Sequence, residues 1–339
     1  MAKKKLGKAT VALDNPPTIL TSACIAGVKE GEGPLAEYFD EILKDDLYDE
    51  QTWEKAESKL QKSTLEKLFT KSNIPISSID YIFAGDLLNQ CAGSHYGLKQ
   101  SGIPFFGLYG ACSTMAEGTA LASMIVDGGY ADYAVALTSS HFCSSEKQYR
   151  FPLEYGGQRP PTAQWTVTGS GGVLLSANGE GPYVTHVTTG KIVDMGISDA
   201  NNMGAAMAPA AVDTIVTHFR DTGFQPSDYD LIVTGDLGKV GSDITRDLVG
   251  ASGLDIARNY DDCGKMIFNL NDQDVHAGGS GCGCSGVVFS GYLLDRMRKG
   301  KINRILFIGT GALMNPLSLL QGESIPCIAH AVTVQRSLM

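Results

Sequence analysis

The sequence lacks the features of a membrane-embedded or secreted chain. No apolar run approaches the roughly 20 residues that a membrane-spanning helix needs, and no secretory leader is apparent. The eight cysteines stand at irregular spacings, which is typical of reduced cytosolic thiols and unlike a disulfide framework. We therefore expect a soluble, cytoplasmic protein that takes part in membrane processes only through partners.

Positive charge is also scarce. Lys and Arg total 27 against 37 Asp and Glu, so the formal net charge is −10 at pH 7. This balance argues against a nucleic-acid partner or an anionic membrane surface. At 339 residues, the chain is long enough for one large α/β body with a deep core.

Two segments of the chain repeat one pattern. Residues 64–87 and 214–237 each read as an amphipathic helix, a polar turn, a buried apolar strand and a Gly-Asp pair at the strand's carboxyl end. The offset of 150 residues holds without a gap. Asp86 and Asp236 therefore end equivalent strands, and each is either a structural side chain of its own turn or a ligand-binding residue.

A second matched pair, residues 129–140 and 300–311, follows in the same order at an offset of 171. Two helix–strand units in one order predict a duplicated α/β protein. We place an N-terminal half at residues 1–180 and a C-terminal half at residues 181–339.

A cysteine stands at the start of a helix built from small residues. An apolar strand is expected over residues 103–109, and the helix over residues 112–126 is so rich in Ala, Ser, Gly and Thr that it must pack closely on all sides. Cys112 would lie at the positive end of the helix dipole, which lowers a thiol pKa and favours a nucleophile. The alternatives for Cys112 are a buried thiol that fills space and a ligand contact.

Residues 139–169 show neither a helical nor a strand period, and a long ordered loop in a compact domain is usually a lid or a site wall. His141 begins this loop and would donate to a ligand carboxylate, with a structural histidine as the equal alternative. Tyr155, Gln164 and Trp165 would lie in the wall, where an aromatic ring can stack on a planar ligand.

Two fused βαβαβ halves with a cysteine at the start of a buried helix resemble the thiolase superfamily. The segment Leu108-Tyr-Gly-Ala-Cys112-Ser resembles the nucleophile turn of its ketoacyl synthase III branch. This resemblance implies an α/β, thiolase-like fold in which the two halves form a five-layer α-β-α-β-α body. Thiolase relatives generally dimerise through the strand after the nucleophile helix, which implies a homodimer interface near residues 133–137.

Longer segments resemble one family within this superfamily, the stage V sporulation AD proteins. These segments are residues 84–90, 110–113, 138–141, 154–158, 204–210, 277–281 and 322–330. The resemblance implies a spore-former protein that binds dipicolinic acid (pyridine-2,6-dicarboxylate). It also implies a forespore location at the spore inner membrane, with membrane proteins of the same operon as partners in uptake of the compound during sporulation and release at germination.

Acyl transfer needs a general base and an oxyanion site besides the nucleophile. In thiolase relatives, a histidine after the second-half strand supplies much of this, but here the loop reads Thr234-Gly-Asp236-Leu. His276 is two or three residues from the place where relatives carry an asparagine. We therefore predict a non-enzymatic binding protein in which Cys112 is a vestigial nucleophile. The alternatives are an acyltransferase or ketoacyl synthase III-like enzyme that uses Cys112, and a ligand-free scaffold for membrane partners.

The predicted pocket lies between the starts of two buried helices, near Cys112 and its counterpart Gly283. Backbone N–H groups there and in the Gly278-Gly279 turn would bind carboxylates without Lys or Arg. Asp194 interrupts an apolar stretch, and we interpret it as a pocket carboxylate, with a surface turn as the alternative. Such a carboxylate beside a dianion needs a proton or a divalent cation, so calcium is expected with the ligand, and no other cofactor. The candidate ligand-binding residues are Cys112, Asp194, Ser113, His141, Asp86, Asp236 and Gly279, with no metal site of the protein's own.

Overall fold

The fold is described from a computed structural model, which covers residues 3–149 and 155–338. Residues 150–154 lie outside the described part of the chain. They belong to the loop predicted over residues 139–169, and Glu154 belongs to the segment 154–158 used for the family resemblance.

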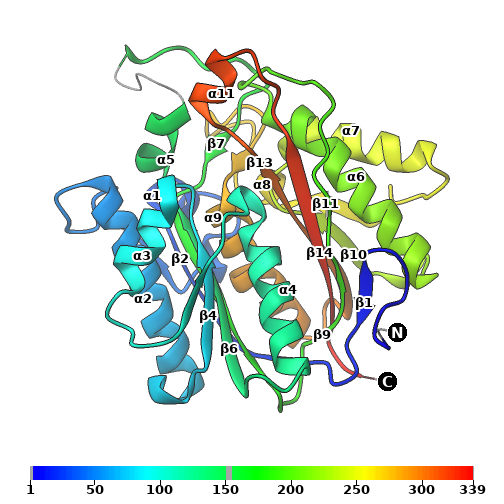
Figure 1. The fold of residues 1–339 in the computed structure, drawn as a ribbon. Helices are drawn as coiled ribbons and strands as arrows, with labels where there is room; N and C mark the ends of the chain where they lie inside the picture. Colours follow the sequence, from blue (N-terminus) through cyan, green and yellow to red (C-terminus); the bar gives the residue numbers. More distant parts are fainter. Residues whose placement is uncertain (1–2, 150–154, 339) are drawn as a thin grey trace.

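Within these residues, ten strands form two five-stranded sheets of the same order, which are linked into one continuous hydrogen-bonded sheet (Figure 1). In the first sheet the order is β5 (Phe105–Gly107), β4 (Tyr81–Gly85), β6 (Tyr133–Ser140), β8 (Gly169–Ser176) and β2 (Thr18–Ala26). In the second sheet it is β11 (Tyr260–Asp262), β10 (Leu231–Thr234), β13 (Arg304–Ala312), β14 (Cys327–Gln335) and β9 (Tyr183–Thr188). Short strands flank them: β1 (Thr10–Ala12) pairs with β9, β3 (Glu41–Ile42) with β2, and β7 (Trp165–Thr166) with β12 (Gly279–Ser280).

The strand directions also repeat. In each sheet the first three strands are parallel and the last two run antiparallel to their neighbours. The two sheets join edge to edge through one residue pair, Thr18 of β2 opposite Tyr183 of β9. The duplicated fold expected from the sequence is therefore confirmed. Strand β1 belongs to the edge of the second sheet although it precedes β2 in the chain.

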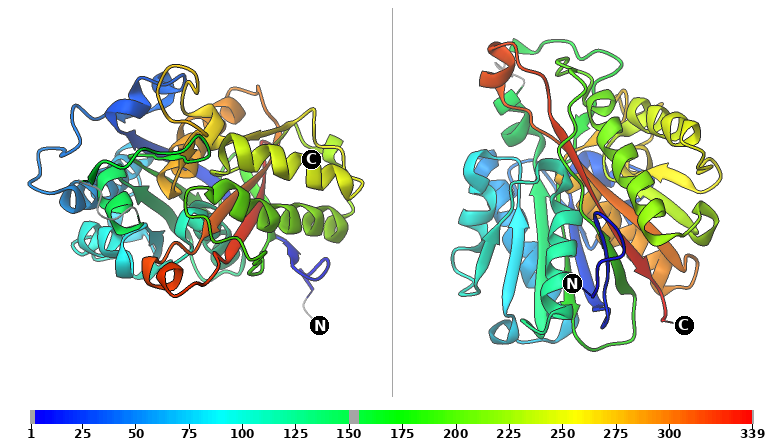
Figure 2. Two further views of the ribbon diagram at one scale, coloured as in Figure 1. Left: turned by 90° about the horizontal axis from the view of Figure 1, so that it is seen from above. Right: turned by 45° about the vertical axis from the view of Figure 1, so that its right-hand side comes forward.

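Helices form three layers around the two sheets (Figure 2). The main helices are α2 (Trp53–Ser72), α3 (Ala92–Leu98), α4 (Thr114–Asp127), α5 (Phe142–Tyr149), α6 (Met203–Thr222), α7 (Gly238–Ala251), α9 (Cys282–Val287), α10 (Leu294–Arg298) and α11 (Pro316–Leu320). Short helices are α1 (Val28–Gly31) and α8 (Cys263–Met266). Helices α2 and α3 cover the first sheet and α6 and α7 the second, while α4 and α9–α10 lie between the sheets. This is the predicted five-layer arrangement.

The hydrogen bonds at the strand starts repeat with the strands. Asp80 precedes β4 and accepts bonds from the N–H groups of Asp132 and Tyr133, at 2.8 and 3.1 Å. Asp230 precedes β10 and accepts bonds from Asn303 and Arg304 in the same way, at 2.6 and 3.0 Å. An aspartate at this point satisfies two backbone donors where a neighbouring strand begins, so the duplication extends to individual side-chain contacts.

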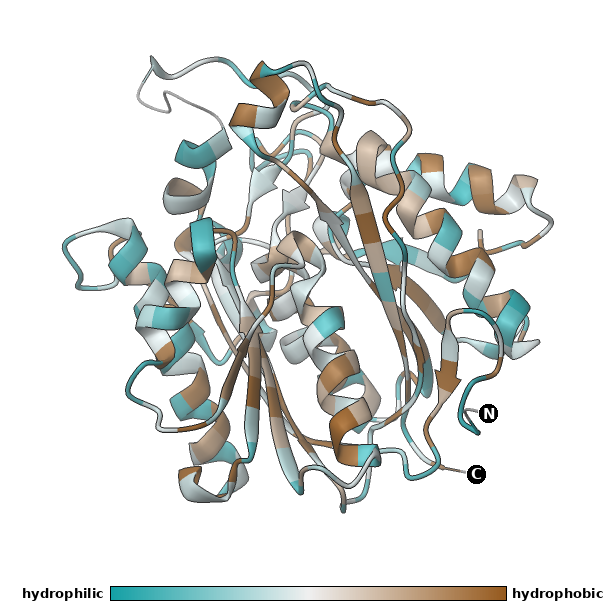
Figure 3. Cartoon of the chain, in the orientation of Figure 1, coloured by the Kyte–Doolittle hydropathy of each residue, from teal (hydrophilic) through white to brown (hydrophobic). Residues whose placement is uncertain are grey.

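The central layer needs small residues because its helices pack at close distance between the two sheets. A Cβ atom added to Gly171 of β8 would lie 2.1 Å from the carbonyl oxygen of Gly286 in α9. Larger apolar side chains fill the space further along, where Phe289 stacks on Phe307 of β13 with ring centroids 4.4 Å apart. Figure 3 shows apolar residues concentrated on the strands and on α4, with mixed character on the outer helices. The composition of the helix at Cys112 is thus explained by packing.

Three expectations about individual elements need correction. The apolar strand expected over residues 103–109 is shorter, as β5 covers Phe105–Gly107. The segment 139–169 is not a continuous loop, because its first part forms α5 and its last part contains β7. Residues 133–137 cannot form a homodimer interface by strand pairing, because β6 is already paired with β4 on one side and β8 on the other.

Among the described helices, none combines the length and the apolar character needed to cross a bilayer.

The close approach of β8 and α9 gives a testable prediction. Gly171→Ala should lower the free energy of unfolding by about 1–3 kcal/mol, because its methyl group would overlap the Gly286 carbonyl in a packed core. Denaturant titration followed by circular dichroism measures this. Gly250→Ala in α7 is the matched control, since no atom lies within 4 Å of the added Cβ. An equal loss in both variants would contradict the packing argument.

Candidate functional site

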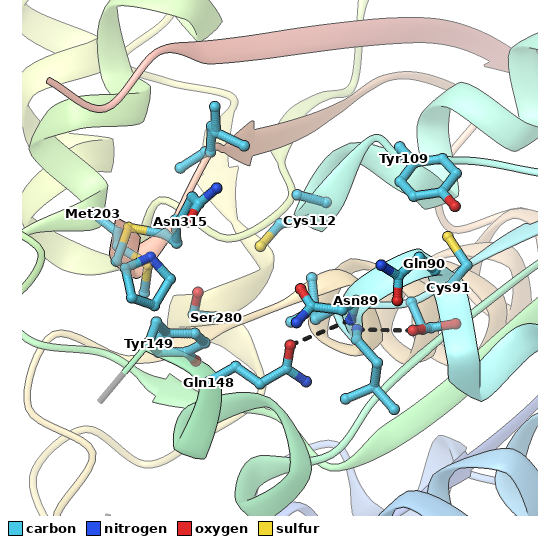
Figure 4. A pocket seen from close by; sticks show the side chains of 18 of the residues that line it. Asn89, Gln90, Cys91, Tyr109, Cys112, Gln148, Tyr149, Met203, Ser280 and Asn315 are labelled. Carbon is cyan, nitrogen blue, oxygen red and sulfur yellow. Dashed lines mark hydrogen bonds between the residues drawn. The ribbon is translucent and has the colours of Figure 1, made fainter. Parts of the chain in front are cut away.

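A pocket of about 560 Å³ lies beyond the carboxyl ends of the parallel strands, where the two halves meet. Its lining comes from the turn after β4, the turn before α4, the end of α5, and the β13–α11 connection. The lining residues are Asp86, Leu87, Leu88, Asn89, Gln90, Cys91, Tyr109, Ala111, Cys112, Gln148, Tyr149, Met203, Ser280, Ala312, Leu313, Met314, Asn315, Pro316 and Leu317. Figure 4 shows Cys112, Tyr149 and Ser280, from three separate segments, turned toward one space.

Carboxamides are prominent among the polar side chains of the pocket wall. Asn89, Gln90, Gln148 and Asn315 bring carboxamide groups to it. Among the described lining residues there is no Lys, Arg or His, and Asp86 is the carboxylate among them. Carboxamides both donate and accept hydrogen bonds, so the wall can hold a polar ligand without an ion pair.

Cys112 faces the pocket with its thiol held by a carboxylate. The thiol hydrogen-bonds the side chain of Asp236, which is fully buried at the end of β10. Burial, and then the negative charge of Asp236, raise the pKa of Cys112 well above its ordinary value. A nucleophilic cysteine needs the opposite shift, because the thiolate is the reactive form. This pair therefore suppresses the reactivity that the helix start would otherwise favour.

Asp236 also accepts a hydrogen bond from a backbone N–H group at the start of α9. It accepts hydrogen bonds from Gly281 N–H at 2.8 Å, Ser280 Oγ at 3.1 Å and Thr310 Oγ1 at 2.7 Å. Burial raises the pKa of Asp236, and these donors lower it. The hypothesis that N–H groups at the start of α9 bind a ligand carboxylate needs correction for two of them: Gly281 N–H binds the protein's own carboxylate, and Gly283 N–H binds Ser140 Oγ at 3.0 Å. Gly278 N–H is also used, by the Val275 carbonyl at 3.0 Å.

Asp86, the counterpart of Asp236, shapes a wall of the pocket. Its carboxylate accepts bonds from Leu88 N–H at 2.8 Å and from the N–H and hydroxyl of Ser94, at 2.7 and 2.6 Å. Burial raises its pKa. These bonds fold the turn that carries Leu87 to Cys91 into the lining. In this turn Gln90 and Cys91 both have positive φ, 55° and 52°, a strained conformation that clusters at functional sites.

In addition to Asp86, the structure places four of the predicted ligand-binding residues in or next to the pocket. Cys112 lines it, and Asp236 lies directly behind Cys112 and Ser280. Gly279 precedes Ser280 in β12, and Ser113 is buried with its hydroxyl donating to the Gly110 carbonyl at 2.7 Å. Ser113 and Gly279 are thus part of the support of the pocket and are not in its lining.

Two predicted residues lie elsewhere. Asp194 is exposed in a turn, where it accepts bonds from Gly196 N–H at 2.9 Å and Ser324 Oγ at 2.5 Å. It is not in the pocket lining, so the surface-turn alternative describes its position. His141 is buried directly before α5 with Nε2 2.7 Å from the Asp46 carbonyl oxygen, and burial lowers its pKa. Its position matches the structural alternative.

The aromatic residues expected in the wall also lie outside the lining. Trp165 stacks on Phe142 with centroids 3.9 Å apart, and Tyr155 is 85% exposed. Gln164 is buried and donates to the carbonyls of Asp236 and Gly279, both at 2.7 Å. The rings that do line the pocket are Tyr109 and Tyr149, which were not predicted. Tyr109 belongs to the segment that resembles a nucleophile turn, so its closeness to Cys112 in the sequence could have identified it as a pocket residue.

Within residues 3–149 and 155–338, no three His, Cys, Asp or Glu side chains converge as a metal site would require. His276, which lies two or three residues from the place where relatives carry an asparagine, is not in the lining, whereas Ser280 is.

A family model described as stage V sporulation protein AD matches residues 7–335. The stage V sporulation protein AD of Bacillus subtilis (strain 168) is 44% identical over 334 residues, which cover 98% of each chain. Among solved structures, the fold is similar to Xanthomonas campestris OleA E117Q, with a TM-score of 0.59 and 15% identity over 94% of this chain and 98% of that chain. It is also similar to 3-oxoacyl-[acyl-carrier-protein] synthase III from Aquifex aeolicus VF5, with a TM-score of 0.57 and 10% identity over 94% and 99% of the two chains. The solved structures thus share a fold that enzymes use.

The Cys112–Asp236 contact predicts how Cys112 reacts. Asp236→Asn should speed alkylation of Cys112 by iodoacetamide, because loss of the carboxylate lowers the pKa of the thiol and so raises the fraction of reactive thiolate. Peptide-resolved mass spectrometry at pH 8 measures the rate. Asp86→Asn removes the equivalent carboxylate of the other half and should leave the Cys112 rate unchanged. Equal rates in wild type and Asp236→Asn would show that Asp236 does not control the thiol.

Proposed function

Because the chain belongs to the stage V sporulation protein AD family, we propose that its pocket binds dipicolinic acid and catalyses no reaction on it. The observation that carries this proposal is the hydrogen bond between the Cys112 thiol and the buried Asp236 carboxylate. Asp236 lies in the loop where thiolase relatives carry the histidine that acts as general base. A carboxylate that holds the thiol protonated opposes acyl transfer, whereas it does not hinder ligand binding.

The pocket wall supports a small planar ligand. Tyr109 and Tyr149 offer ring faces, and the carboxamides of Asn89, Gln90 and Asn315 offer donors for carboxylate oxygens. The volume of about 560 Å³ is within the usual range of small-molecule sites. With Asp86 in the wall and no described cation there, a dianion needs a counter-charge, so we propose that calcium enters with the ligand as its chelate.

In the cell, this activity would serve uptake of dipicolinic acid into the developing spore and its release at germination. The protein would act in the forespore, peripherally at the spore inner membrane, with membrane proteins of the same operon as partners. Family membership supports the sporulation role.

Titration calorimetry with dipicolinic acid tests the function. We expect saturable binding that is stronger with calcium and about two- to thirteenfold weaker in Cys112→Ala, the effect of one lost hydrogen bond of about 0.5–1.5 kcal/mol. Cys143→Ala is the matched control, because Cys143 is a half-buried thiol of α5 outside the pocket. Affinity that is the same with and without calcium would contradict the chelate. Absence of heat at every concentration would contradict dipicolinate binding and favour a scaffold, and acylation of Cys112 by thioesters would favour an enzyme.

Asp194 has a supporting role in this proposal. Through Ser324 it ties the turn at residues 194–196 to the segment after α11, and Pro316 and Leu317 of α11 line the pocket. Asp194→Ala and Ser324→Ala should therefore each weaken binding about threefold, without adding in the double variant. If Asp194 contacts the ligand or its calcium directly, Asp194→Ala alone will weaken binding.

We also propose a homodimer, formed through the free edge of β5. This strand pairs only with β4 among the described residues, and exposed aromatic side chains lie on and beside it: Tyr96, Phe106 and Tyr109 are 66%, 51% and 71% exposed. An unpaired edge with apolar side chains is a template for another strand.

Sedimentation velocity tests the interface. Phe106→Glu should convert a dimer into a monomer, because each dimer would bring two such charges to the paired edge. Tyr130→Glu is the control, since Tyr130 is 74% exposed but lies after α4, away from β5. A wild-type protein that sediments as a monomer at all concentrations, or a Phe106→Glu dimer, would contradict this interface.

A further inference from the structure

Two walls of the pocket are connected from behind by buried polar side chains of α2. One wall is the turn after β4, which Asp86 ties to Ser94. The other is α5, whose last residues, Gln148 and Tyr149, line the pocket. No lining residue belongs to α2, so its contribution is indirect.

Gln61 is the first link in this connection. Its Nε2 has two N–H groups and lies within hydrogen-bond distance of three acceptors: Ser94 Oγ at 2.9 Å, Ser139 Oγ at 2.9 Å and the Gly85 carbonyl at 3.2 Å. It therefore joins the wall after β4 to the end of β6, from which the chain enters α5.

Glu57, one helical turn before Gln61, completes the connection. Ser139 Oγ lies 3.1 Å from Glu57 Oε1, and Ser144 Oγ of α5 lies 2.6 Å from Oε2. The side chain is fully buried. A continuous chain of hydrogen bonds thus runs from Asp86 through Ser94, Gln61 and Ser139 to Glu57 and α5.

The duplicated half shows that the fold does not require these polar residues. At the offset of 150 that relates α2 to α6, the counterparts of Glu57 and Gln61 are Met207 and Ala211, both fully buried. Apolar side chains thus serve at the equivalent position between a helix and its sheet. The polar pair occurs in the half where helix and sheet stand behind the walls of the pocket.

Helix α5 depends on such contacts because its buried side is polar. The residues that it buries are Ser144, Ser145 and Glu146. At the front of the pocket, Gln148 Oε1 accepts a bond from Asn89 N–H at 3.2 Å, the dashed line that joins the two walls in Figure 4. A helix attached through hydrogen bonds, with little apolar burial, can detach at a low free-energy cost.

We propose that Glu57 is a positioning residue whose bound proton keeps α5 in place, so that loss of this proton loosens one wall of the pocket and weakens ligand binding. The binding part of this proposal rests on the proposed function, whereas the effect on α5 does not.

The surroundings of Glu57 favour its protonated form at neutral pH. Burial, followed by the charge of Asp86 and then that of Glu54, raises its pKa to about 8, while the serine hydroxyls lower it. The other charged or titratable groups on the packed elements include Cys143, Glu146, Lys147 and Tyr149 of α5, His141 directly before α5, His95 of α3 and Cys282 of α9, and Lys147 is paired with Glu54. Because the folded pKa lies above the ordinary 4.5, the contribution of Glu57 is complete below pH 4.5 and is lost as the pH rises through about 8.

Two measurements between pH 6 and 9 test the proposal. Calorimetry with dipicolinic acid should show affinity falling about tenfold from pH 7 to pH 9, as expected for one required proton with a pKa of about 8. Carboxylic acids of the probe keep their charge over this range. Glu57→Gln should bind with nearly constant affinity, because a carboxamide can donate to one serine and accept from the other. Glu66→Gln, an exposed change on the same helix, should keep the wild-type pH dependence.

Hydrogen–deuterium exchange without ligand gives the second readout. After correction for the intrinsic pH dependence of exchange, α5 should lose protection between pH 7 and 9 in wild type and keep it in Glu57→Gln. Ser144→Ala should lose protection already at pH 6. The proposal is overturned if Glu57→Gln follows the wild-type pH profile or if protection of α5 is independent of pH. If wild type binds no dipicolinic acid at any pH, the proposed function fails, while the exchange data still decide the role of Glu57.

Discussion

The Asp236 carboxylate, buried where the two halves meet, is the constraint on which the site depends. Its four hydrogen-bond donors come from the turn before α4, from the start of α9 and from β13. One side chain therefore connects segments from both halves. The same carboxylate keeps the Cys112 thiol protonated and uses the N–H group at the start of α9. A binding pocket can work under these conditions, because ligand binding does not require a reactive thiolate.

The duplication shows which interactions belong to the fold and which to the site. Asp80 and Asp230 make the same bonds at the starts of β4 and β10. At the other end of these strands the halves differ: Asp86 shapes its own turn, whereas Asp236 also bonds Cys112 of the other half. The helices behind the sheets differ as well. The polar Glu57 of α2 and the apolar Met207 of α6 occupy equivalent buried positions in the two halves. Equivalent positions have thus kept structural contacts at one edge and diverged at the edge that bears the pocket.

The sequence predicted the repeated strands, the buried helix after Cys112 and the closeness of Asp86 and Asp236 to one site, because apolar periodicity and strand ends follow from local pattern. It did not reveal α5, because that helix buries Ser144, Ser145 and Glu146 and so has no apolar period. Nor did it place Asp194, His141 or Trp165, whose positions depend on the path of long connections. The carboxamides of Asn89, Gln148 and Asn315 carry no local signal, since only the tertiary fold brings them together.

The order of strands has a consequence for synthesis of the chain. The second sheet is completed by β14, which inserts between β13 and β9 although it is the last strand in the sequence. Helix α4, made much earlier, packs against β14 and β13 as well as the first sheet. During translation its second face therefore has no partner until β13 and β14 have been made. A nascent chain stalled after β8 would carry a complete first sheet with an uncovered apolar helix on it, a natural target for chaperones.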